Sequence, residues 1–308
     1  MPPHERVDYV LLIASGLEQL ASEAISAHFA VPGSAIRQIG LPPASMQWAV
    51  DRSQPGLAEG AIFPGEAGIA KFLVSLPLPT SLAEWAAQHA MLASFPCTQG
   101  VLAPLALASD IALTDEGLEQ VREVARSTEG WDAAIRTWRY CRPSPPPLAP
   151  NGEFSCSTDG LSFRASAVRD GKHSYNSPRL MEVVGGAVYQ RRGLRVALKG
   201  FDMEVVAIML QSELLIGLNV WQGKDYTSAR LGPEPRPLVP HADTTARLRP
   251  STAWLMVQMA KVQPGDVLID PMCGVGTLPL VAAAASPCAL SWAGDADEHV
   301  LVQVPPLA

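Results

Sequence analysis

The stretch 262–280 holds side chains whose types and spacing fit a ligand-binding turn. Asp270 directly follows a short apolar run, and Gly274 and Gly276 come next, ahead of an alanine-rich segment of helical character. Where a strand passes into a helix, small residues allow the backbone to approach a nucleotide-like ligand closely. The stretch therefore predicts a strand, a ligand-binding turn and a helix. The structural alternative is a tight strand-to-helix connection that binds nothing.

A second acid lies at a suitable distance from this turn. Asp295 follows Asp270 by 25 residues and comes after the apolar segment 288–293. In dinucleotide-binding sheets an acid roughly 20 residues beyond the glycine turn binds the ribose hydroxyls. The glycines do not form GxGxxG and no GK[ST] is present, so neither a dinucleotide fingerprint nor a P-loop is predicted. Asp295 favours a ligand-binding turn over a purely structural one.

Cys273 lies inside the turn, and the other cysteines are scattered along the chain. No base is near Cys273 in the sequence, so a small buried residue is predicted there and not a nucleophile. An odd number of cysteines without a CxxC pair predicts a reducing compartment, the cytoplasm or the nucleus, with no disulfide framework and no metal site. The five cysteines are Cys97, Cys141, Cys156, Cys273 and Cys288.

Charge is distributed unevenly. The net charge of -7 and the pI of about 5.4 exclude a globally basic nucleic-acid binder, yet the segment 151–200 has eight basic and four acidic residues, a local balance of +4. Such a segment fits phosphate binding, and a solvated helix face is the alternative. His173, a lone histidine in this segment, is expected to be a hydrogen-bonding surface residue and not an acid–base catalyst. The basic residues are Arg164, Arg169, Lys172, Arg179, Arg191, Arg192, Arg195 and Lys199.

The 308 residues are enough for two or three compact units, and no apolar run of about twenty residues predicts a membrane span. Hydrophobic periodicity predicts alternating strands and amphipathic helices. Strands are expected at 7–14, 69–76, 162–168, 204–210 and 213–221, with a further short apolar segment at 47–50. Helices are expected at 16–29, 81–94, 177–192 and within 114–138, and an extended proline-rich loop at 142–150. Core positions, and not base-stacking platforms, are expected for Trp131, Trp138 and Trp221.

The motif at 270–280, DPMCGVGTLPL, resembles the S-adenosylmethionine-binding motif of class I methyltransferases. Its DPxCGxG form is similar to that of THUMP-domain tRNA (guanine-N2)-methyltransferases. Three further stretches resemble this family in the same order. They are SGLEQLASEAI at 15–25 (its ferredoxin-like start), FRASAVRDGKHSYNS through VVGGAV at 163–188 (its THUMP core), and LRPSTAWLM at 248–256 (the segment beside the cofactor).

The resemblance implies an α/β and α+β multidomain fold. A ferredoxin-like N-terminal domain is expected at 1–95 and a THUMP RNA-binding domain at 96–222. A linker is expected at 223–247, and the first part of a Rossmann-like methyltransferase domain at 248–308. The activity implied is transfer of a methyl group from S-adenosylmethionine to a guanosine of tRNA. A small nuclear RNA is the alternative substrate, a small methyltransferase activator subunit is a further partner to consider, and no membrane is implied.

The resemblance also carries roles over to single residues. The residues that it assigns to the cofactor are Asp270, Cys273, Gly274, Gly276, Asp295, Arg249, Pro250 and Ser251. The residues that we expect to contact RNA are Arg164, Arg169, Lys172 and His173.

The chain departs from the family in its catalytic motif. In the family a [DN]PP[FY]-type motif follows the fourth of seven strands, whereas about two strands are expected here before Ala308. The final Pro305-Pro306-Leu307-Ala308 lacks the Asp or Asn and the aromatic residue, so no catalytic residue is assigned. We therefore expect a C-terminally truncated methyltransferase domain. The alternatives are a non-catalytic RNA-binding fragment or isoform, and a nucleotide-binding oxidoreductase remnant, against which the missing third glycine counts.

Overall fold

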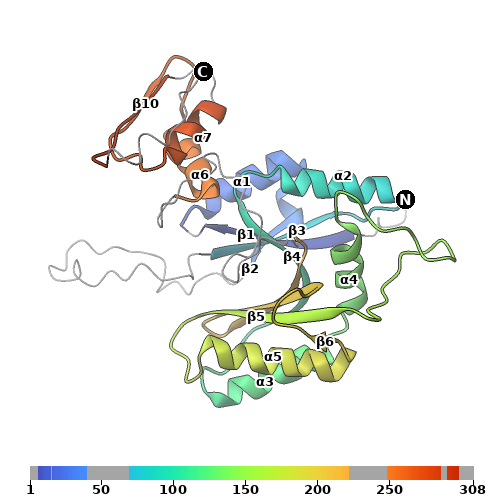
Figure 1. The fold of residues 1–308 in the computed structure, drawn as a ribbon. Helices are drawn as coiled ribbons and strands as arrows, with labels where there is room; N and C mark the ends of the chain where they lie inside the picture. Colours follow the sequence, from blue (N-terminus) through green and yellow to red (C-terminus); the bar gives the residue numbers. More distant parts are fainter. Residues whose placement is uncertain (1–5, 15, 40–68, 222–247, 286–289, 298–308) are drawn as a thin grey trace.

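One eight-stranded sheet connects most of the chain in the computed structural model (Figure 1), which describes residues 6–14, 16–39, 69–221, 248–285 and 290–297. The strand order is β2-β3-β1-β4-β8-β7-β5-β6. The strands are β1 (Arg6–Ala14), β2 (Ile36–Ile39), β3 (Ile69–Pro77), β4 (Thr98–Ala108), β5 (Ser162–Asp170), β6 (Arg195–Val196), β7 (Met203–Leu210) and β8 (Glu213–Asn219). The helices of this part are α1 (Glu18–Phe29), the short 3-10 helix η1 (Gly33–Ala35), α2 (Leu82–Ala93), α3 (Asp115–Ser127), α4 (Trp131–Tyr140) and α5 (Ser177–Arg192).

The N-terminal strand is central because both of its faces are buried. Nearly all of β1 after Asp8 is inaccessible to solvent, as expected of a continuous apolar run with strands on both sides. It pairs antiparallel with β3 and with β4. Helix α2 begins where Ser81 accepts a hydrogen bond from the Glu84 amide at 3.2 Å, an N-cap contact. The strands at 7–14 and 69–76 and the helices at 16–29 and 81–94 are confirmed.

Strand β4 was not predicted, although it joins the two halves of the sheet. Pro104 lies within it, and proline is disfavoured in a central strand because it cannot donate a ladder hydrogen bond. The structure accommodates Pro104 through a register shift between Pro104 and Ala106 in the pairing with β8. The sheet thus runs without interruption across the expected domain boundary at 95–96, and that boundary stays a prediction.

The second half of the sheet contains a parallel pair, β5 and β7, connected through α5. Helix α5 has the predicted bounds: Asn176 caps it by accepting from the Arg179 amide at 3.0 Å, and Gly193 ends it with φ +63°. The expected helical stretch 114–138 is divided into α3 and α4. Gly130 lies at the break, where a Cβ would come within 2.6 Å of the Leu105 carbonyl oxygen.

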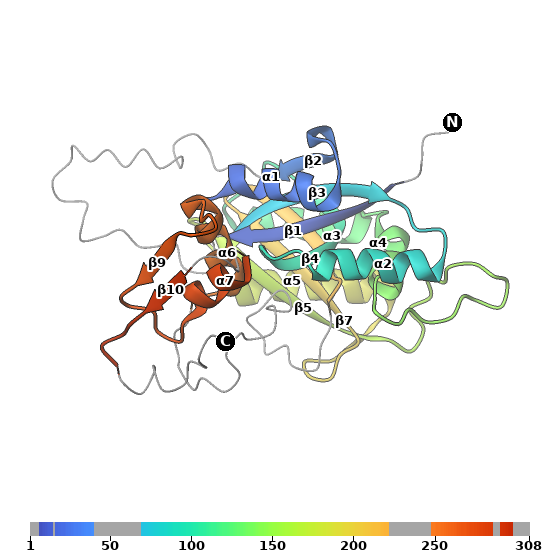
Figure 2. The same cartoon turned by 90° about the horizontal axis from the view of Figure 1, so that it is seen from above.

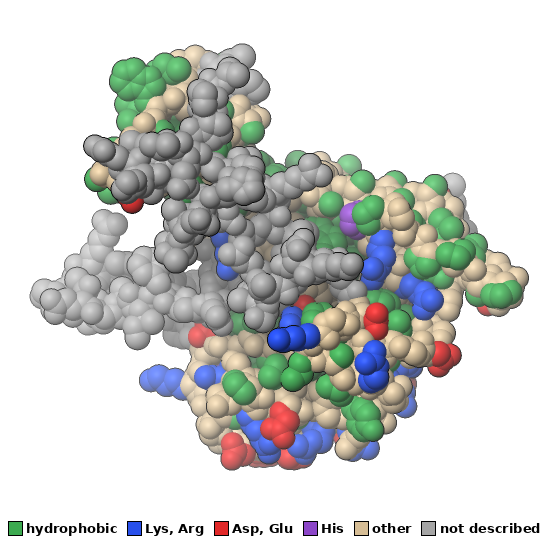
Figure 3. Space-filling view, in the orientation of Figure 1, with side chains coloured by type: hydrophobic (Ala, Val, Ile, Leu, Met, Phe, Trp, Pro, Cys, Tyr) green, Lys and Arg blue, Asp and Glu red, His purple; other side chains and the backbone are tan. Residues whose placement is uncertain are grey.

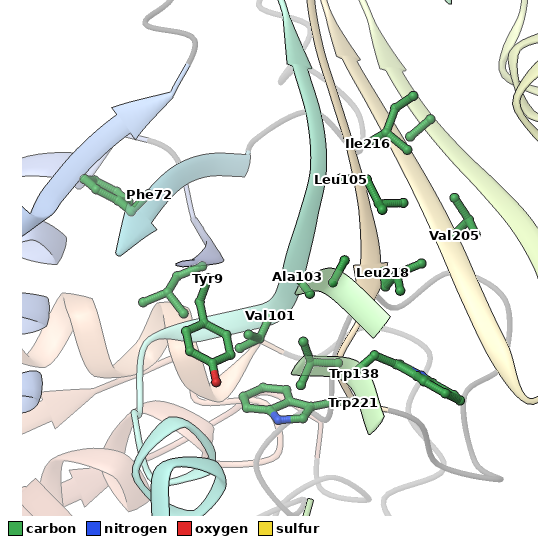
Figure 4. Packing of buried hydrophobic residues seen from close by; sticks show 14 of the residues in the cluster. Tyr9, Phe72, Val101, Ala103, Leu105, Trp138, Val205, Ile216, Leu218 and Trp221 are labelled. Atoms are coloured by element: carbon green, nitrogen blue, oxygen red, sulfur yellow. The ribbon is translucent and has the colours of Figure 1, made fainter. Parts of the chain in front are cut away.

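A single large core runs under both halves of the sheet. Figure 4 shows Tyr9 beside Val101 and Trp221, while Trp138 lies on the side of Leu218. Trp131, Trp138 and Trp221 are each at most 5% exposed, which confirms the core positions predicted for them. The described part of the chain has no helix long and apolar enough to cross a membrane. The segment 47–50 and the whole of the expected linker, 223–247, lie outside the described residues.

A buried carboxylate links three strands of the second half. Glu204 on β7 accepts hydrogen bonds from Arg164 at 2.6 Å, Ser166 at 2.5 Å and Asn219 at 2.9 Å. The side chain of Glu204 is 5% exposed and that of Arg164 is 14% exposed, so water screens this ion pair little. Arg164 also lies 4.2 Å from the ring centre of Phe201. Removing either charge would leave the other buried without compensation.

We expect Arg164→Ala to lower the free energy of unfolding by about 3 kcal/mol, because an unpaired buried carboxylate is strongly destabilising. Arg179→Ala is the matched control, since it removes an Arg–Glu pair on the exposed surface of α5, with Glu182. Its effect should be much smaller. Urea unfolding of both variants measures the difference, and equal losses of stability would contradict the buried network.

A lysine is buried in the first half of the sheet. Lys71 on β3 is 2% exposed and is the cross-strand neighbour of Leu12. Burial lowers the pKa of Lys71 to about 8, and the nearby Glu213 and Asp170 carboxylates oppose this shift. Because the pKa in the folded state lies below the unfolded value, the folded chain loses this proton first. Stability contributed by Lys71 therefore increases as the pH rises through 8 toward 10.

We expect the free energy of unfolding to rise by about 2 kcal/mol more between pH 8 and pH 10 in the native chain than in Lys71→Met. Chemical unfolding at the two pH values gives the change in the free energy of unfolding for each protein. The contributions of all other titrating groups cancel when the two changes are subtracted. The same pH dependence in both proteins would show that Lys71 keeps an ordinary pKa.

Candidate functional site

A small α/β unit carries the predicted turn. It consists of α6 (Pro250–Ala260), β9 (Val267–Asp270), α7 (Thr277–Ala285) and β10 (Leu290–Ala293). Figure 2 shows β9 and β10 side by side and apart from the eight-stranded sheet. The two strands are parallel, with Asp270 opposite Ala293. The strand, turn, helix and second strand predicted for this stretch are confirmed, and the carboxyl ends of both parallel strands meet at the turn.

The turn brings five of the predicted cofactor residues together, namely Asp270, Cys273, Gly274, Gly276 and Asp295. The Gly274 amide donates a 2.8 Å hydrogen bond to Asp295 Oδ2, across 21 residues. The Cys273 amide donates to the Gly294 carbonyl and the Gly294 amide donates to the Asp270 carbonyl, both at 2.9 Å. The end of β10 therefore holds the turn from one side.

Asp295 is an ionised acceptor in this arrangement. Backbone hydrogen bonds from Asp297 and from Gly274 lower its pKa below the ordinary aspartate value. Asp270 Oδ1 accepts from the Met272 amide at 3.2 Å. A carboxylate has about four lone-pair sites, so both acids can accept further hydrogen bonds from a ligand. The site is one where hydroxyl groups of a ligand would be bound.

Cys273 is unsuited to nucleophilic chemistry. Its side chain is 8% exposed, and its pKa is raised by burial and by the nearby carboxylates of Asp270 and Asp295. A raised pKa keeps the thiol protonated at neutral pH, whereas the thiolate is the nucleophile. The thiol points to the Gly274 carbonyl at 3.4 Å. The structure supports the prediction of a small buried residue at this position.

The backbone conformation explains why glycines occupy the turn. Gly274 has φ +51° and Gly276 has φ +76°, in the left-handed region that side chains disfavour. A Cβ added to Gly274 would meet nothing within 4 Å. Open space in front of a glycine is what a ligand requires for close approach to the backbone. Val275 and Thr277 are buried on either side and fix the start of α7.

The remaining predicted cofactor residues lie at the start of α6, which packs against α7 and also against α1 and β1. Arg249 donates to the Gln99 side chain of β4 at 2.9 Å, Pro250 occupies the first turn of α6, and Ser251 is buried. Leu255 of α6 belongs to the main core. These residues attach the α/β unit to the sheet, and their contact with a ligand stays a prediction.

One face of the β9–β10 pair is uncovered among the described residues. Val267, Ile269, Leu290 and Trp292 lie on it and are 54–67% exposed. The opposite face packs through Leu268 against α6 and α7. A doubly wound sheet has helices on both faces, so the described unit shows one of its two expected layers.

The four predicted RNA-binding residues do not share one role. Lys172 is exposed, but Arg164 is engaged with Glu204. Arg169 donates to the Gly171 carbonyl at 2.7 Å and lies 3.1 Å from His173 Nδ1, and His173 Nε2 lies 2.7 Å from the Gln211 carbonyl oxygen. His173 therefore hydrogen-bonds as expected, and together with Arg169 it fixes the turn after β5. Contact with RNA stays a prediction for all four.

Sequence reasoning missed Glu204 as the partner of Arg164. The two residues are 40 positions apart and face each other only because β5 and β7 pair in parallel at that register. The signal available was an acid at the start of an otherwise apolar strand, 204–210. The described residues contain no group of three or more His, Cys, Asp or Glu side chains that could hold a metal.

Comparison with known proteins agrees with this site. Residues 239–293 match the UPF0020 family, described as an RMKL-like methyltransferase domain. A tRNA (guanine(6)-N2)-methyltransferase of Thermus thermophilus is 31% identical over 144 residues, 46% of this chain and 39% of the relative. A human U6 snRNA (guanine-N(2))-methyltransferase, THUMPD2, is 26% identical over 125 residues, 40% of this chain and 22% of the relative. The chain thus spans about two fifths of the length of the Thermus relative.

The fold agrees as well. The crystal structure of TrmN from Thermus thermophilus matches with a TM-score of 0.53 and 21% identity, covering 96% of this chain and 68% of that one. At this identity the likeness establishes the architecture alone. The chain is therefore similar in sequence to a tRNA (guanine-N2)-methyltransferase over 46% of its length, similar in architecture to TrmN, and matches a methyltransferase domain over the residues of the turn up to Ala293.

Proposed function

We propose that this chain is the RNA-binding and cofactor-binding part of a methyltransferase that acts on a guanosine of tRNA with S-adenosylmethionine. The observation that carries the proposal is the turn between β9 and α7. Gly274 has open space in front of it, and its amide donates a hydrogen bond to Asp295, which follows the next strand. A match of residues 239–293, which include Gly274, to a methyltransferase domain supports this reading.

The residues of the turn fit S-adenosylmethionine. Asp295 would accept hydrogen bonds from the ribose hydroxyls, and Gly274 and Gly276 would let the ligand approach the backbone. Asp270, at the end of β9, would face the positively charged part of the ligand. When bound, S-adenosylmethionine supplies an activated methyl group. We assign no residue of this chain to the transfer step, and the assignment covers binding and orientation.

For the RNA we propose tRNA, with small nuclear RNA as the alternative, because one relative is a tRNA methyltransferase and another is a U6 snRNA methyltransferase. The support from the chain itself is its local charge, +4 over 151–200 in a protein of net charge -7. Cations clustered on an acidic protein favour a polyanionic partner at that surface. We propose the cytoplasm as the compartment, and a small activator subunit remains a prediction.

Asp295→Ala should weaken S-adenosylmethionine binding by about tenfold or more, because hydrogen bonds to a charged group contribute about 1.5–3 kcal/mol. Asp266→Ala is the matched control: Asp266 also accepts a backbone hydrogen bond, from Gln263, but at the far end of β9. Isothermal titration calorimetry measures both affinities. Equal affinities for the two variants would remove Asp295 from the site, and tighter binding of NAD would favour an oxidoreductase instead.

Lys172→Glu should weaken tRNA binding and lower the slope of log affinity against log salt by about one, as expected for a lost phosphate contact. Arg37→Glu is the control, since Arg37 is exposed on β2, the edge strand farthest from β6 in the sheet order. Filter binding over a range of salt concentrations measures the slope. If both variants lose the same affinity, Lys172 has no specific contact.

A further inference from the structure

The C-terminal turn of α5 and the edge strand β6 form an exposed basic corner. We define the α5–β6 corner by its six side chains, Tyr189, Arg191, Arg192, Arg195, Leu198 and Lys199. Four of them are cationic, and no acid occurs between residues 183 and 201. In Figure 3, Lys and Arg side chains lie over the lower half of the molecule, where α5 and β6 are found, together with apolar side chains and several acidic ones.

The charged groups of the corner are available to a ligand. Arg191, Arg195 and Lys199 are exposed, and within the described part of the chain neither Arg191 nor Lys199 has a hydrogen bond or ion pair. Arg195 has one acid nearby, Asp202. That carboxylate is already held by Ser162, whose amide and hydroxyl donate to it at 2.8 and 2.6 Å. The corner therefore keeps most of its positive charge.

An aromatic side chain accompanies these cations. Tyr189 is 57% exposed at the end of α5, although most of the described aromatic residues are buried. Leu198 is 73% exposed on the segment that follows β6. An exposed ring accompanied by exposed cations is a combination that binds unpaired nucleotides, because bases stack on the ring while phosphates meet the cations.

The corner is held in place by its surroundings. Arg192 lies 5.5 Å from the ring centre of Trp131 on α4, and Gly193 caps α5 by donating to the Tyr189 carbonyl at 2.8 Å. Strand β6 pairs with β5, and Ala197 donates to the Phe163 carbonyl at 2.9 Å. A preformed surface loses little conformational freedom on binding, which favours affinity.

The geometry points to the α5–β6 corner as an RNA-contacting surface, in which Arg191, Arg195 and Lys199 bind phosphates and Tyr189 stacks on an unpaired base. This inference rests on the proposed function and names the surface and the type of RNA segment it would bind. It differs from the prediction made from the sequence motif, since Arg164 is committed to Glu204 and Arg169 to the turn after β5. A protein strand is a poorer fit, because β6 offers only two residues for pairing.

The test compares the native chain with Arg195→Glu, Lys199→Glu, Tyr189→Ala and Tyr189→Phe in filter binding to tRNA and to a single-stranded RNA of about twelve nucleotides. Arg37→Glu on β2 is the control with the same charge change. We expect about tenfold weaker binding for Tyr189→Ala, near-native binding for Tyr189→Phe, and a salt slope reduced by about one for each charge reversal. Melting temperatures check that every variant is folded.

The possible results separate the claim that the α5–β6 corner binds RNA from the proposed function. If the native chain binds tRNA and the variants Arg195→Glu and Lys199→Glu bind it no worse than Arg37→Glu does, RNA binding at the α5–β6 corner is contradicted. The proposed function is then left intact. Binding by Tyr189→Ala equal to that of Tyr189→Phe would overturn the stacking contact. No binding of tRNA by the native chain would contradict the proposed function itself.

Discussion

The double pairing of β4 is the constraint on which the arrangement of the chain depends. Leu102 of β4 faces Val10 of β1 on one side and Asn219 of β8 on the other. Strand β4 thereby joins the group β2-β3-β1 to the group β8-β7-β5-β6 in one sheet. Without it, each group would have a further exposed edge. Because α6 packs on α1 and β1, the unit with the predicted ligand-binding turn is attached to one half of the sheet, while the α5–β6 corner lies at the far edge of the other half.

The distribution of charged side chains follows from the same arrangement of strands. The buried Glu204 forms an ion pair with Arg164 within the sheet. This arginine therefore stabilises the fold and is not available to a ligand at the surface. Within 151–200, the exposed cations outside the ion pairs of Arg164 and Arg179 are Lys172 and, at the α5–β6 corner, Arg191, Arg195 and Lys199. In a chain of net charge -7, this distribution of charge supports the proposed binding of a polyanion at the β6 edge of the sheet. The acids of the turn, Asp270 and Asp295, lie in a different unit, where they suit a ligand with hydroxyl groups and positive charge.

Local signals made much of the fold predictable. The bounds of α5 follow from Asn176 at the cap, Pro178 in the first turn and Gly193 at the end, all readable from adjacent residues. The turn was predicted for the same reason, and Asp295 was predicted because a strand, a helix and a strand require a nearly constant number of residues. By contrast, β4 was missed because Pro104 argues against a central strand, and the partner of Arg164 depends on a non-local register.

The most direct test of the account is hydrogen exchange of the chain with and without S-adenosylmethionine, followed by mass spectrometry. The account predicts slower exchange in peptides covering residues 270–277 and 294–297, with no change in β1, β4 and β8. A ligand bound by Gly274 and Asp295 would restrict the opening of the turn that they close. Unchanged exchange in both peptides at a saturating ligand concentration, or protection confined to the eight-stranded sheet, would contradict it.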